Sequence, residues 1–585
     1  MKLGIRPLNI FSLLLFLLPL TASGQQEQVQ HVRIIATSDV HGNYLPFDFI
    51  NRLPSGGSLS RVATYVNRVR SAQGAENVLL LDNGDILQGQ PTAYFYNFID
   101  TTSTHLCAEA LNFLHYDAQT IGNHDVEAGH AVYDRWARQC SAPILAANVI
   151  DSITGHPYFR PFTIVNRGGL RIAILGLVTP AIPQWLPKNL WSGIYFSDMV
   201  AAARRWVPVL RYKAKADIIV GLFHSGTGSM DAAYTRRQEN AALQVARMVP
   251  GFDLVVCGHD HREASLRIEN VRGDTVVVLN PGSGCMAVAE ADIAATRHAD
   301  GTLVKRTQGR IVSIADEAPD TAFVGQFAGQ WNAVTDFVDE RIGSCASDLS
   351  TRPAFFGPSP FVDLIHTMQL RIAHADISFC APLSFDATIA KGDIHVADMF
   401  KLYKYENQLY AMLLSGREIK RYLEYSYALW TAQMTDATDH MILFRSDALQ
   451  IDVPWQRLVN ASYNFDSAAG LRYTVDLRRP AGDRITIESL SDGRPFSPDS
   501  TYRVAVNSYR GGGGGNLLTK GAGIAKEDLP ARIVWSTDKD LRYYLMQDIR
   551  RQGTIHPKAR NEWRFIPEAW IEQAARRDSI LLFGE

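Results

Sequence analysis

The stretch from Asp253 to His261, DLVVCGHDH, puts a short apolar run directly before a cluster of polar side chains. The same order recurs in VRIIATSD (32–39), NVLLLDNGD (77–85), RIAILGLVTP (171–180), DIIVGLFHSG (217–226) and TVVVLNPGSG (275–284). Short apolar runs that end in turn residues are typical of buried strands. Segments with helical spacing, such as LSRVATYVNRVRSAQG (59–74), lie between them. An α/β sandwich with functional loops at the strand ends is therefore predicted from His31 to about Ala315.

The length and composition of the chain set further bounds. At 585 residues the chain exceeds the size at which single cores stop growing, so two domains are expected. Hydrophobic residues make up 46% and charged residues 20%, as in ordinary globular proteins. A formal net charge of −2 argues against binding to long nucleic acid or to an anionic membrane. A small anionic substrate held by local cations or metals fits this composition.

The first residues, MKLGIRPLNIFSLLLFLLPLTASGQQ, predict a signal peptide. Lys2 and Arg6 precede an apolar run from Ile10 to Leu20, and small residues follow before Gln25. A membrane anchor is the alternative, but the run is shorter than the roughly 20 residues needed to span a bilayer. We expect residues 1–24 to be removed and the mature chain to be periplasmic or secreted, without a stable membrane anchor.

Cysteine usage leaves the disulfide question open. The six cysteines, Cys107, Cys140, Cys257, Cys285, Cys345 and Cys380, form no C-x-x-C pair and no zinc-finger spacing. An oxidising compartment would permit disulfides, although a domain of this size does not need them. Cys257 follows the apolar run LVV and is expected to be a buried thiol.

A change in sequence texture marks the domain boundary. Residues 321–341, TAFVGQFAGQWNAVTDFVDER, have helical periodicity and predict a connecting helix. A second α/β domain is predicted over 342–585, after a first domain over 25–320. Its only low-complexity stretch is the glycine run Gly511–Gly515, which follows the strand-like TYRVAVNSYR.

Five polar motifs follow the strands of the first domain. They are Asp39-x-His41, Gly84-Asp85, Gly122-Asn123-His124-Asp125, His224-Ser225-Gly226 and Gly258-His259-Asp260-His261. Imidazole and carboxylate ligands suit zinc, manganese, iron or cobalt. One ion is expected to be bound by Asp39, His41 and His261, the other by Asn123, His224 and His259, with Asp85 bridging the two. Two ions about 3.5–4 Å apart can hold phosphate oxygens and activate a water molecule.

Each motif taken alone is a weak signal. A single buried histidine is more often a core residue than a ligand, and Gly-Asn-His-Asp can be an ordinary turn. Five unrelated turns in this order, each after a strand, would be an improbable coincidence. The joint pattern therefore predicts a site with two divalent metal ions.

These same motifs resemble the signature of calcineurin-type metallophosphoesterases. In the second domain NFDSAAGLRYTVDL (464–477), YRVAVNSYRGGGGG (502–515) and GTIHPKARNEWR (553–564) resemble the C-terminal domain of exported bacterial 5′-nucleotidases. They are most similar to the 2′,3′-cyclic-nucleotide 2′-phosphodiesterase/3′-nucleotidase branch. The resemblance implies a four-layer α/β/β/α sandwich followed by an α/β substrate-binding domain, and covers essentially the whole mature chain.

The resemblance also implies roles for side chains beyond the metal ligands. His124 matches a histidine that donates to the transferred phosphoryl group, which makes physical sense for an imidazolium near an oxyanion. Glu127 is four residues after Asn123, where relatives carry an acid that orients this histidine; Asp125 is the alternative. The nucleophile would be hydroxide held by the metals, since no G-x-S-x-G motif surrounds Ser225.

The second domain is expected to hold the nucleoside. Phe465 and Tyr509 match positions where relatives stack the base between two aromatic rings, and each such contact contributes about 1–3 kcal/mol. For Phe465 alone a core position would be the ordinary expectation. Tyr509 lies beside the glycine run, where the backbone is open to close approach.

One segment departs from the 5′-nucleotidase pattern. The stretch FCAPLSFDATIAKGDI (379–394) contains no arginine where 5′-nucleotidases have one that grips the phosphate. Ala381, Pro382 and Phe385 instead echo the segment of relatives that cleave cyclic and 3′-nucleotides. The loss of a bidentate cation weakens the grip on a dianionic 5′-phosphate more than on a monoanionic cyclic diester.

The sequence therefore favours an exported, monomeric nucleotide phosphoesterase that opens 2′,3′-cyclic nucleotides and dephosphorylates 3′-nucleotides. A 5′-nucleotidase or UDP-sugar hydrolase is the nearest alternative. A non-catalytic, exported nucleotide-binding protein is the alternative of another class, although a binder has little need of a complete set of metal ligands.

Overall fold

The structure is a computed structural model that describes residues 1, 29–231 and 233–584. The predicted signal peptide, apart from Met1, lies outside the described residues. No helix within the described part of the chain is both long enough and apolar enough to cross a membrane. The six cysteines are all free thiols, and Cys257 is fully buried, as expected.

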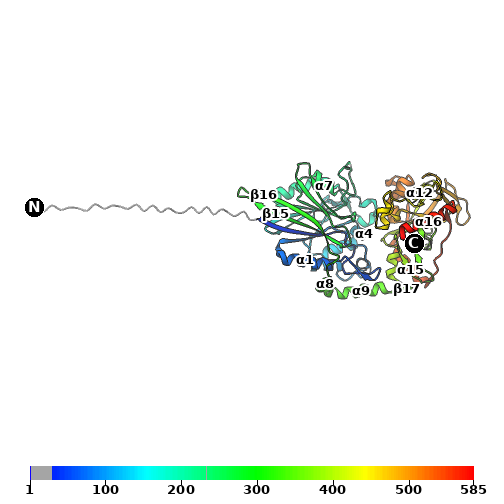
Figure 1. The fold of residues 1–585 in the computed structure, drawn as a ribbon, viewed down its shortest axis with the longest axis horizontal. Helices are drawn as coiled ribbons and strands as arrows, with labels where there is room; N and C mark the ends of the chain where they lie inside the picture. Colours follow the sequence, from blue (N-terminus) through cyan, green and yellow to red (C-terminus); the bar gives the residue numbers. More distant parts are fainter. Residues whose placement is uncertain (2–28, 232, 585) are drawn as a thin grey trace.

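Two six-stranded sheets form the first half of the chain (Figure 1). The first has the order β16 (Leu303–Ser313), β15 (Ala287–Arg297), β1 (Val29–Thr37), β4 (Val78–Asp82), β5 (Ala118–Thr120) and β6 (Ile144–Leu145). The second has the order β13 (Ala264–Glu269), β14 (Thr275–Asn280), β12 (Leu254–Cys257), β11 (Ile218–His224), β9 (Leu170–Val178) and β8 (Phe162–Arg167). The central strands of both sheets are parallel, so their carboxyl ends meet at one edge.

Successive side chains of β1 point to opposite faces of the first sheet, and so pack against two different layers. Ile34 faces the second sheet and packs in one apolar cluster with Ile174 and Val220. Ile35 points the opposite way, into the cluster formed with α1 (Leu59–Gln73) and α3 (Leu106–Phe113). Helices α6 (Met199–Pro208) and α7 (Ala242–Met248) cover the outer face of the second sheet. The four-layer α/β/β/α sandwich is thereby confirmed.

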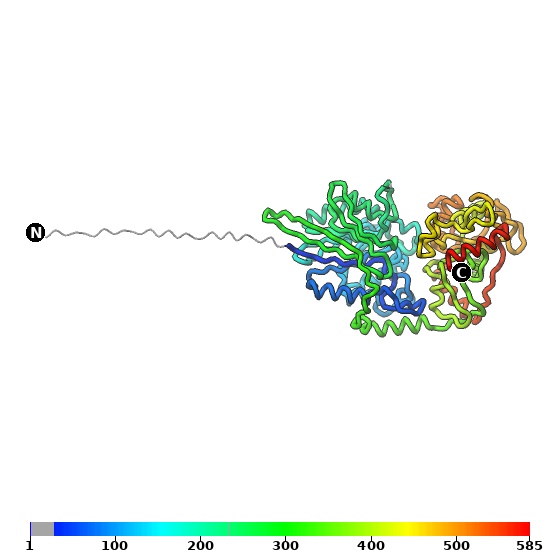
Figure 2. The backbone as a smooth tube through the Cα atoms, viewed as in Figure 1, coloured from blue at the N-terminus to red at the C-terminus, as the bar shows by residue number. Residues whose placement is uncertain are grey.

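Two helices connect the halves of the chain along one side (Figure 2). Helix α8 (Thr321–Gln326) and helix α9 (Ala328–Asp339) replace the single helix predicted over 321–341. The break is at Phe327, whose backbone leaves the helical region (φ −103°, ψ 17°). Phe323 and Phe327 are both buried against Phe113, so packing on the first half fixes this break.

The second half is built around a mixed five-stranded sheet. Its order is β23 (Ser467–Ala469), β19 (Ile377–Cys380), β26 (Thr501–Asn507), β22 (Gln408–Ser415) and β27 (Ile533–Asp540). Helices α10 (Pro360–Ala373) and α12 (Gly416–Trp430) pack on it, and α12 starts with a capping box between Ser415 and Glu418. The two-domain α/β architecture is thus as predicted.

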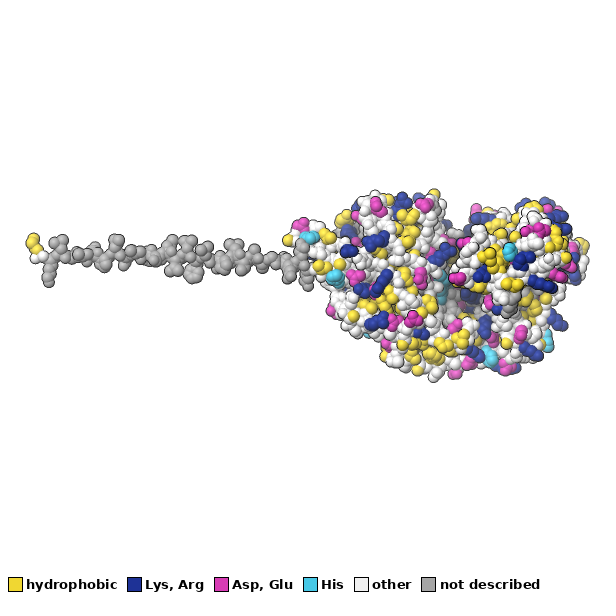
Figure 3. Space-filling model, viewed as in Figure 1, with side chains coloured by type: hydrophobic (Ala, Val, Ile, Leu, Met, Phe, Trp, Pro, Cys, Tyr) yellow, Lys and Arg dark blue, Asp and Glu magenta, His cyan; other side chains and the backbone are white. Residues whose placement is uncertain are grey.

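Tyr94, the last residue of α2 (Pro91–Tyr94), joins the two halves directly. Its hydroxyl donates to Asp540 Oδ2 at 3.1 Å, and its ring lies 4.8 Å from the Arg542 guanidinium. The same guanidinium lies 4.0 Å from the Phe400 ring, so Tyr94 is enclosed by residues of the second half. Figure 3 shows basic and acidic side chains interspersed over the visible face of both halves, with no extended basic surface there.

Candidate metal centre

The predicted ligands lie where the parallel strands of the two sheets end. Asp39 and His41 follow β1, Asp85 follows β4, and His224 is the last residue of β11. His259 and His261 follow β12, while Asn123 begins the short helix α4 (Asn123–Glu127) after β5. Five of the seven have left-handed backbone conformations: Asp39 (φ 50°), His41 (φ 49°), Asp85 (φ 55°), His259 (φ 71°) and His261 (φ 56°). Such strained positions are typical of functional sites that the surrounding fold enforces.

The glycines of the motifs are required by close packing. A Cβ atom on Gly122 would lie 2.1 Å from Asp85 Oδ1, and one on Gly258 would lie 2.5 Å from Asp39 Oδ2. Gly84 combines a positive φ of 84° with a contact of 2.6 Å between its hypothetical Cβ and the Gly122 nitrogen. Only glycine fits at these three positions, because the loops carrying the carboxylates touch one another.

Asp39, His41 and His261 form the first group of converging ligand atoms. The Nε2 atoms of His41 and His261 are 2.9 Å apart, and His261 Nε2 is 3.3 Å from Asp39 Oδ1. His41 Nδ1 lies 3.2 Å from the Gln88 carbonyl, which fixes the proton on Nδ1 and leaves the Nε2 lone pair free. Burial and the neighbouring His261 lower the pKa of His41 to about 3, so it is neutral, as a metal ligand must be.

Asp85, His224 and His259 form the second group, and Asn123 joins it. His224 Nε2 lies 3.0 Å from Asp85 Oδ2 and 3.1 Å from Asn123 Oδ1. His224 Nδ1 lies 2.8 Å from the Asn83 carbonyl, which again leaves Nε2 for the centre. These two groups match the predicted division of ligands, although Asp85 falls with the second group and its bridging role stays a prediction.

A divalent cation fits this arrangement. Asp85 Oδ2 is buried and has no hydrogen-bond partner among the described residues, although His224 Nε2 is 3.0 Å away. A buried carboxylate oxygen without a hydrogen bond of suitable geometry, beside a ring nitrogen, is a position that a cation would fill. Burial alone would lower the pKa of His224, but Asp85 and Asp39 raise it to about 10. The carboxylates of Asp85 and Asp39 thus favour a positive charge at this position. A bound metal ion would supply that charge and displace the proton from His224.

His124 lies beside this centre without belonging to either group. Its Nδ1 is 2.5 Å from Glu127 Oε2, one turn along α4, and its backbone N–H donates to Asp85 Oδ1 at 2.8 Å. Burial opposes a charge on the imidazole, yet Asp85 and Glu127 raise the pKa of His124 to about 9. Asp125, the alternative orienting residue, instead accepts hydrogen bonds from the backbone N–H groups of Asp85, Ile86, Leu87 and Gly122.

The prediction that Phe465 presents a face to a nucleobase disagrees with the structure. Phe465 is 1% exposed, and its ring stacks on Trp430 at 5.6 Å with an interplanar angle of 2°. Phe355 makes a T-shaped contact with it at 6.2 Å, so the ring belongs to the buried core of the second half. A 3₁₀ turn, Ser462–Asn464, directly precedes Phe465. Within this turn Tyr463 is exposed, whereas Phe465 is buried.

Tyr463, which is exposed, and Tyr509, which is partly exposed, form an aromatic pair in the second half. Their ring centroids are 6.5 Å apart at an angle of 88°, and Tyr405 lies 6.3 Å from Tyr463. Burial raises the pKa of Tyr509 to about 12, and the carboxylate of Glu239 in the first half contributes to the rise. Glu239 also raises the pKa of Tyr463, after burial. The glycine run beside Tyr509 also approaches the first half, since a Cβ atom on Gly512 would lie 3.5 Å from the carbonyl oxygen of Trp185, whose ring stacks on His259. The pair therefore belongs to the part of the second half that lies next to the second ligand group.

Three further residues near the centre were missed by the sequence analysis. Glu239 Oε1 lies 3.0 Å from His259 Nε2, and the Trp185 ring stacks on His259 at 5.5 Å and 28°. Glu406, in the second half, has a side chain only 3% exposed and lies near enough to His124 and Glu127 for their charges to act on it. None of the three belongs to a motif, so no spacing signal could have identified them.

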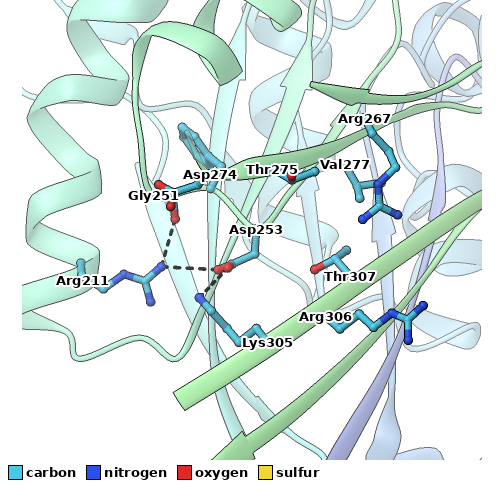
Figure 4. A pocket seen from close by; sticks show the side chains of 11 residues that line it. Arg211, Gly251, Asp253, Arg267, Asp274, Thr275, Val277, Lys305, Arg306 and Thr307 are labelled. Carbon is cyan, nitrogen blue, oxygen red and sulfur yellow. Dashed lines mark hydrogen bonds and ion pairs between the residues drawn. The ribbon is translucent and has the colours of Figure 1, made fainter. Parts of the chain in front are cut away.

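A cavity of about 570 Å³ lies at the opposite, amino-terminal ends of β12 and β14 (Figure 4). Arg211 and Lys305 line it, and both contact Asp253, at 3.4 Å and 2.5 Å. None of its lining residues is a predicted ligand, so this cavity is separate from the metal centre.

Comparisons with known proteins agree with this geometry. Residues 32–263 match the family model of the calcineurin-like phosphoesterase, and residues 334–520 match that of the 5′-nucleotidase C-terminal domain. The 2′,3′-cyclic-nucleotide 2′-phosphodiesterase/3′-nucleotidase of Yersinia enterocolitica is 26% identical, over 96% of this chain and 91% of its own length. The trifunctional nucleotide phosphoesterase protein YfkN of Bacillus subtilis is 27% identical over 97% of this chain, which spans only 41% of that relative's length. A putative 5′-nucleotidase from Staphylococcus aureus has the same fold, with a TM-score of 0.75, 20% identity, and 92% and 99% of the two chains covered.

The sandwich, with its converging histidines and carboxylates, defines a metal-dependent phosphoesterase of the calcineurin-like class. The chain thus joins a calcineurin-like phosphoesterase domain to a 5′-nucleotidase C-terminal domain.

Proposed function

We propose that this enzyme hydrolyses 2′,3′-cyclic nucleotides and the 3′-nucleotides they yield, with two divalent metal ions in the centre. The observation that carries the nucleotide assignment is the Tyr463–Tyr509 pair beside the glycine run, which approaches Trp185 next to the ligand His259. Aromatic faces bind any base by stacking, while the phosphate is left to the ions. A nucleotide is the ligand that needs both features at once.

The arrangement of arginines supports a cyclic or 3′-phosphate over a 5′-phosphate. Residues 379–394 contain no arginine, and Arg352 nearby is held by Asp386 through contacts of 2.9 and 3.0 Å. Arg510, beside the glycine run, is 2% exposed and directs its donors to protein oxygens. Neither guanidinium is free to form a bidentate grip on a phosphate dianion.

Each group at the centre has a task in this proposal. The metal ions, when bound, supply positive charge for the phosphate oxygens and lower the pKa of water. Asp39, His41 and His261 would hold one ion, and Asn123, His224 and His259 the other, with Asp85 between them. His124, charged and fixed by Glu127, would donate from Nε2 to a phosphoryl oxygen and stabilise charge developing there.

A substrate panel tests the proposal. Adenosine 2′,3′-cyclic phosphate, 3′-AMP, 5′-AMP and UDP-glucose would be compared under the same conditions with manganese or zinc. We expect kcat/KM to be highest for the cyclic nucleotide and 3′-AMP. Turnover of 5′-AMP or UDP-glucose alone would favour the 5′-nucleotidase alternative, and fewer than about one ion per chain, with no activity after added manganese, would favour a non-catalytic binder.

We further infer that the enzyme is exported and acts as a monomer. The signal-peptide sequence of residues 1–24 supports export. Detection of the mature chain, starting near Gln25, outside the cytoplasm would test it.

A further inference from the structure

Two histidines of the centre share one pattern of hydrogen bonding. His41 and His224 each direct Nδ1 to a backbone carbonyl, of Gln88 at 3.2 Å and of Asn83 at 2.8 Å. An acceptor at one ring nitrogen fixes the proton there and points the other lone pair at the metal. The backbone thus sets the tautomers of His41 and His224.

His259 differs from them in both respects. Its Nε2 lies 3.0 Å from a side-chain oxygen, Glu239 Oε1, rather than from a backbone carbonyl. A proton on Nε2 leaves the lone pair of His259 on Nδ1. We propose that Glu239 is a positioning residue, whose carboxylate holds the Nε2–H of His259 and thereby directs Nδ1 to the second metal ion. This inference rests on the proposed two-metal centre.

The loop that carries Glu239 is built to place it there. The Ser225 hydroxyl, next to the ligand His224, donates to the Glu239 carbonyl at 2.7 Å and accepts from the Ala241 N–H at 2.9 Å. Asp260, between His259 and His261, accepts from the backbone N–H of Thr227 at 2.9 Å. The segments 225–231 and 233–241 are therefore tied to the ends of β11 and β12, which supply His224 and His259 to the second group.

The Trp185 ring makes a second contact with His259, in addition to that of Glu239. The two ring centroids are 5.5 Å apart and the ring planes are inclined by 28°. The imidazole of His259 is therefore positioned by the face of the Trp185 ring and by the Glu239 carboxylate. The Glu239 side chain is 49% exposed, so its charge alone contributes little to folding stability. Its effect is instead expected in the affinity for metal, where removal of an outer hydrogen-bond partner typically costs 10- to 100-fold.

Glu239→Ala and Glu239→Gln in the full chain test this role, with manganese as the probe. The metal bound per chain would be measured by elemental analysis after dialysis at graded free manganese, with the two ions followed by their paramagnetic resonance signals. We expect Glu239→Ala to weaken one of the two ions about 10- to 100-fold and leave the other unchanged. Glu239→Gln keeps an oxygen acceptor for Nε2–H, so it should stay within a few-fold of the wild type.

Asp231→Asn is the matched control, since Asp231 is an exposed acid in the same loop. It should bind both ions as the wild type does. Equal manganese affinity in Glu239→Ala and the wild type would overturn the inference, as would equal losses in Glu239→Ala and Asp231→Asn. Circular dichroism of the metal-free proteins would identify a folding defect, and a loss of metal explained by one would also count against it.

The proposed function can fail separately. A wild type that binds two ions but hydrolyses no nucleotide would refute the substrate assignment, while the affinity difference for Glu239→Ala would still support the positioning role. If the wild type hydrolyses nucleotides and Glu239→Ala keeps the wild-type metal affinity, the substrate assignment would stand and the positioning role of Glu239 would be refuted.

Discussion

Arg510 forms a two-pronged ion pair with Asp466, in which Nε donates to Oδ2 at 3.0 Å and Nη2 to Oδ1 at 2.9 Å. Its remaining donors bind the Gly514 carbonyl at 2.8 Å, Asn464 Oδ1 at 3.2 Å and the Tyr463 carbonyl at 2.7 Å. All five N–H donors of the guanidinium are therefore used. Through this one side chain the glycine run and the turn bearing Tyr463 are fixed relative to each other.

Replacement of Arg510 should be costly for stability. Arg510→Ala leaves Asp466 as a buried, unpaired carboxylate, which typically lowers the free energy of unfolding by about 3–5 kcal/mol. Urea unfolding would measure it. The matched control is Arg417→Ala, which removes an exposed pair with Asp499 and should cost under about 1 kcal/mol. Similar losses for both variants would contradict a structural role for Arg510.

Tyr463 and Phe465, only two residues apart, should respond differently to truncation. Tyr463→Ala removes an exposed ring from the aromatic pair, and a lost stacking contact of about 1–3 kcal/mol predicts a rise in KM of about 5- to 160-fold. Steady-state kinetics with 3′-AMP would measure it, with Tyr212→Ala, an exposed tyrosine of the first half, as the control. An unchanged KM would remove Tyr463 from the substrate site.

Phe465→Ala should act on stability instead of on substrate binding. The deletion of a buried phenylalanine typically lowers the free energy of unfolding by about 3–5 kcal/mol. Because the ring stacks on Trp430 within the core, KM at a temperature where the variant is folded should stay within a few-fold of the wild type. A large rise in KM with unchanged stability would restore Phe465 as a base-stacking residue.

His124→Ala should lower kcat by about 10²- to 10³-fold, as does the loss of other donors to developing oxyanions. The metal content should stay near that of the wild type, because His124 belongs to neither ligand group. Glu127→Gln should lower kcat less, since the imidazole remains. The exposed His156 provides the control, and a joint loss of metal and activity in His124→Ala would identify His124 as a ligand or a structural residue.

Glu406 predicts a change of stability with pH. Burial raises its pKa to about 8, and the Glu127 and Asp540 charges add to this, while Arg542 at 3.6 Å and His124 oppose it. A folded-state pKa above the unfolded value of about 4.5 means that this contribution is complete below about pH 4.5 and is lost as the pH rises through about 8. The loss should be on the order of 2 kcal/mol between pH 6 and pH 9.

Glu406→Gln cannot ionise and should remove that part of the pH dependence. The comparison is the difference in the free energy of unfolding between variant and wild type at each pH, so that other titrating groups cancel. We expect the variant to gain relative to the wild type as the pH rises from 6 to about 8, and the difference to level off above that. A difference that stays constant from pH 6 to pH 9 would mean that Glu406 has an ordinary pKa.

The sequence by itself determined the sandwich and the identity of the candidate ligands. Each of the five motifs lies at or just after the end of its own strand, and parallel strands bring their carboxyl ends to one edge whatever the loops do. Gly84, Gly122 and Gly258 stand in the same motifs, although what requires a glycine there is contact between loops that are distant in the sequence. Ligand chemistry and strand order were enough to predict the centre.

Only the tertiary structure decided which side chains surround that centre. Whether Tyr463 or Phe465 is accessible depends on one 3₁₀ turn and on the Trp430 ring, far away along the chain. Glu239, Trp185 and Glu406 reach the site from loops without a motif. Short-range patterns fix backbone elements, whereas the direction of a loop side chain follows from packing between distant segments, which no spacing in the sequence records.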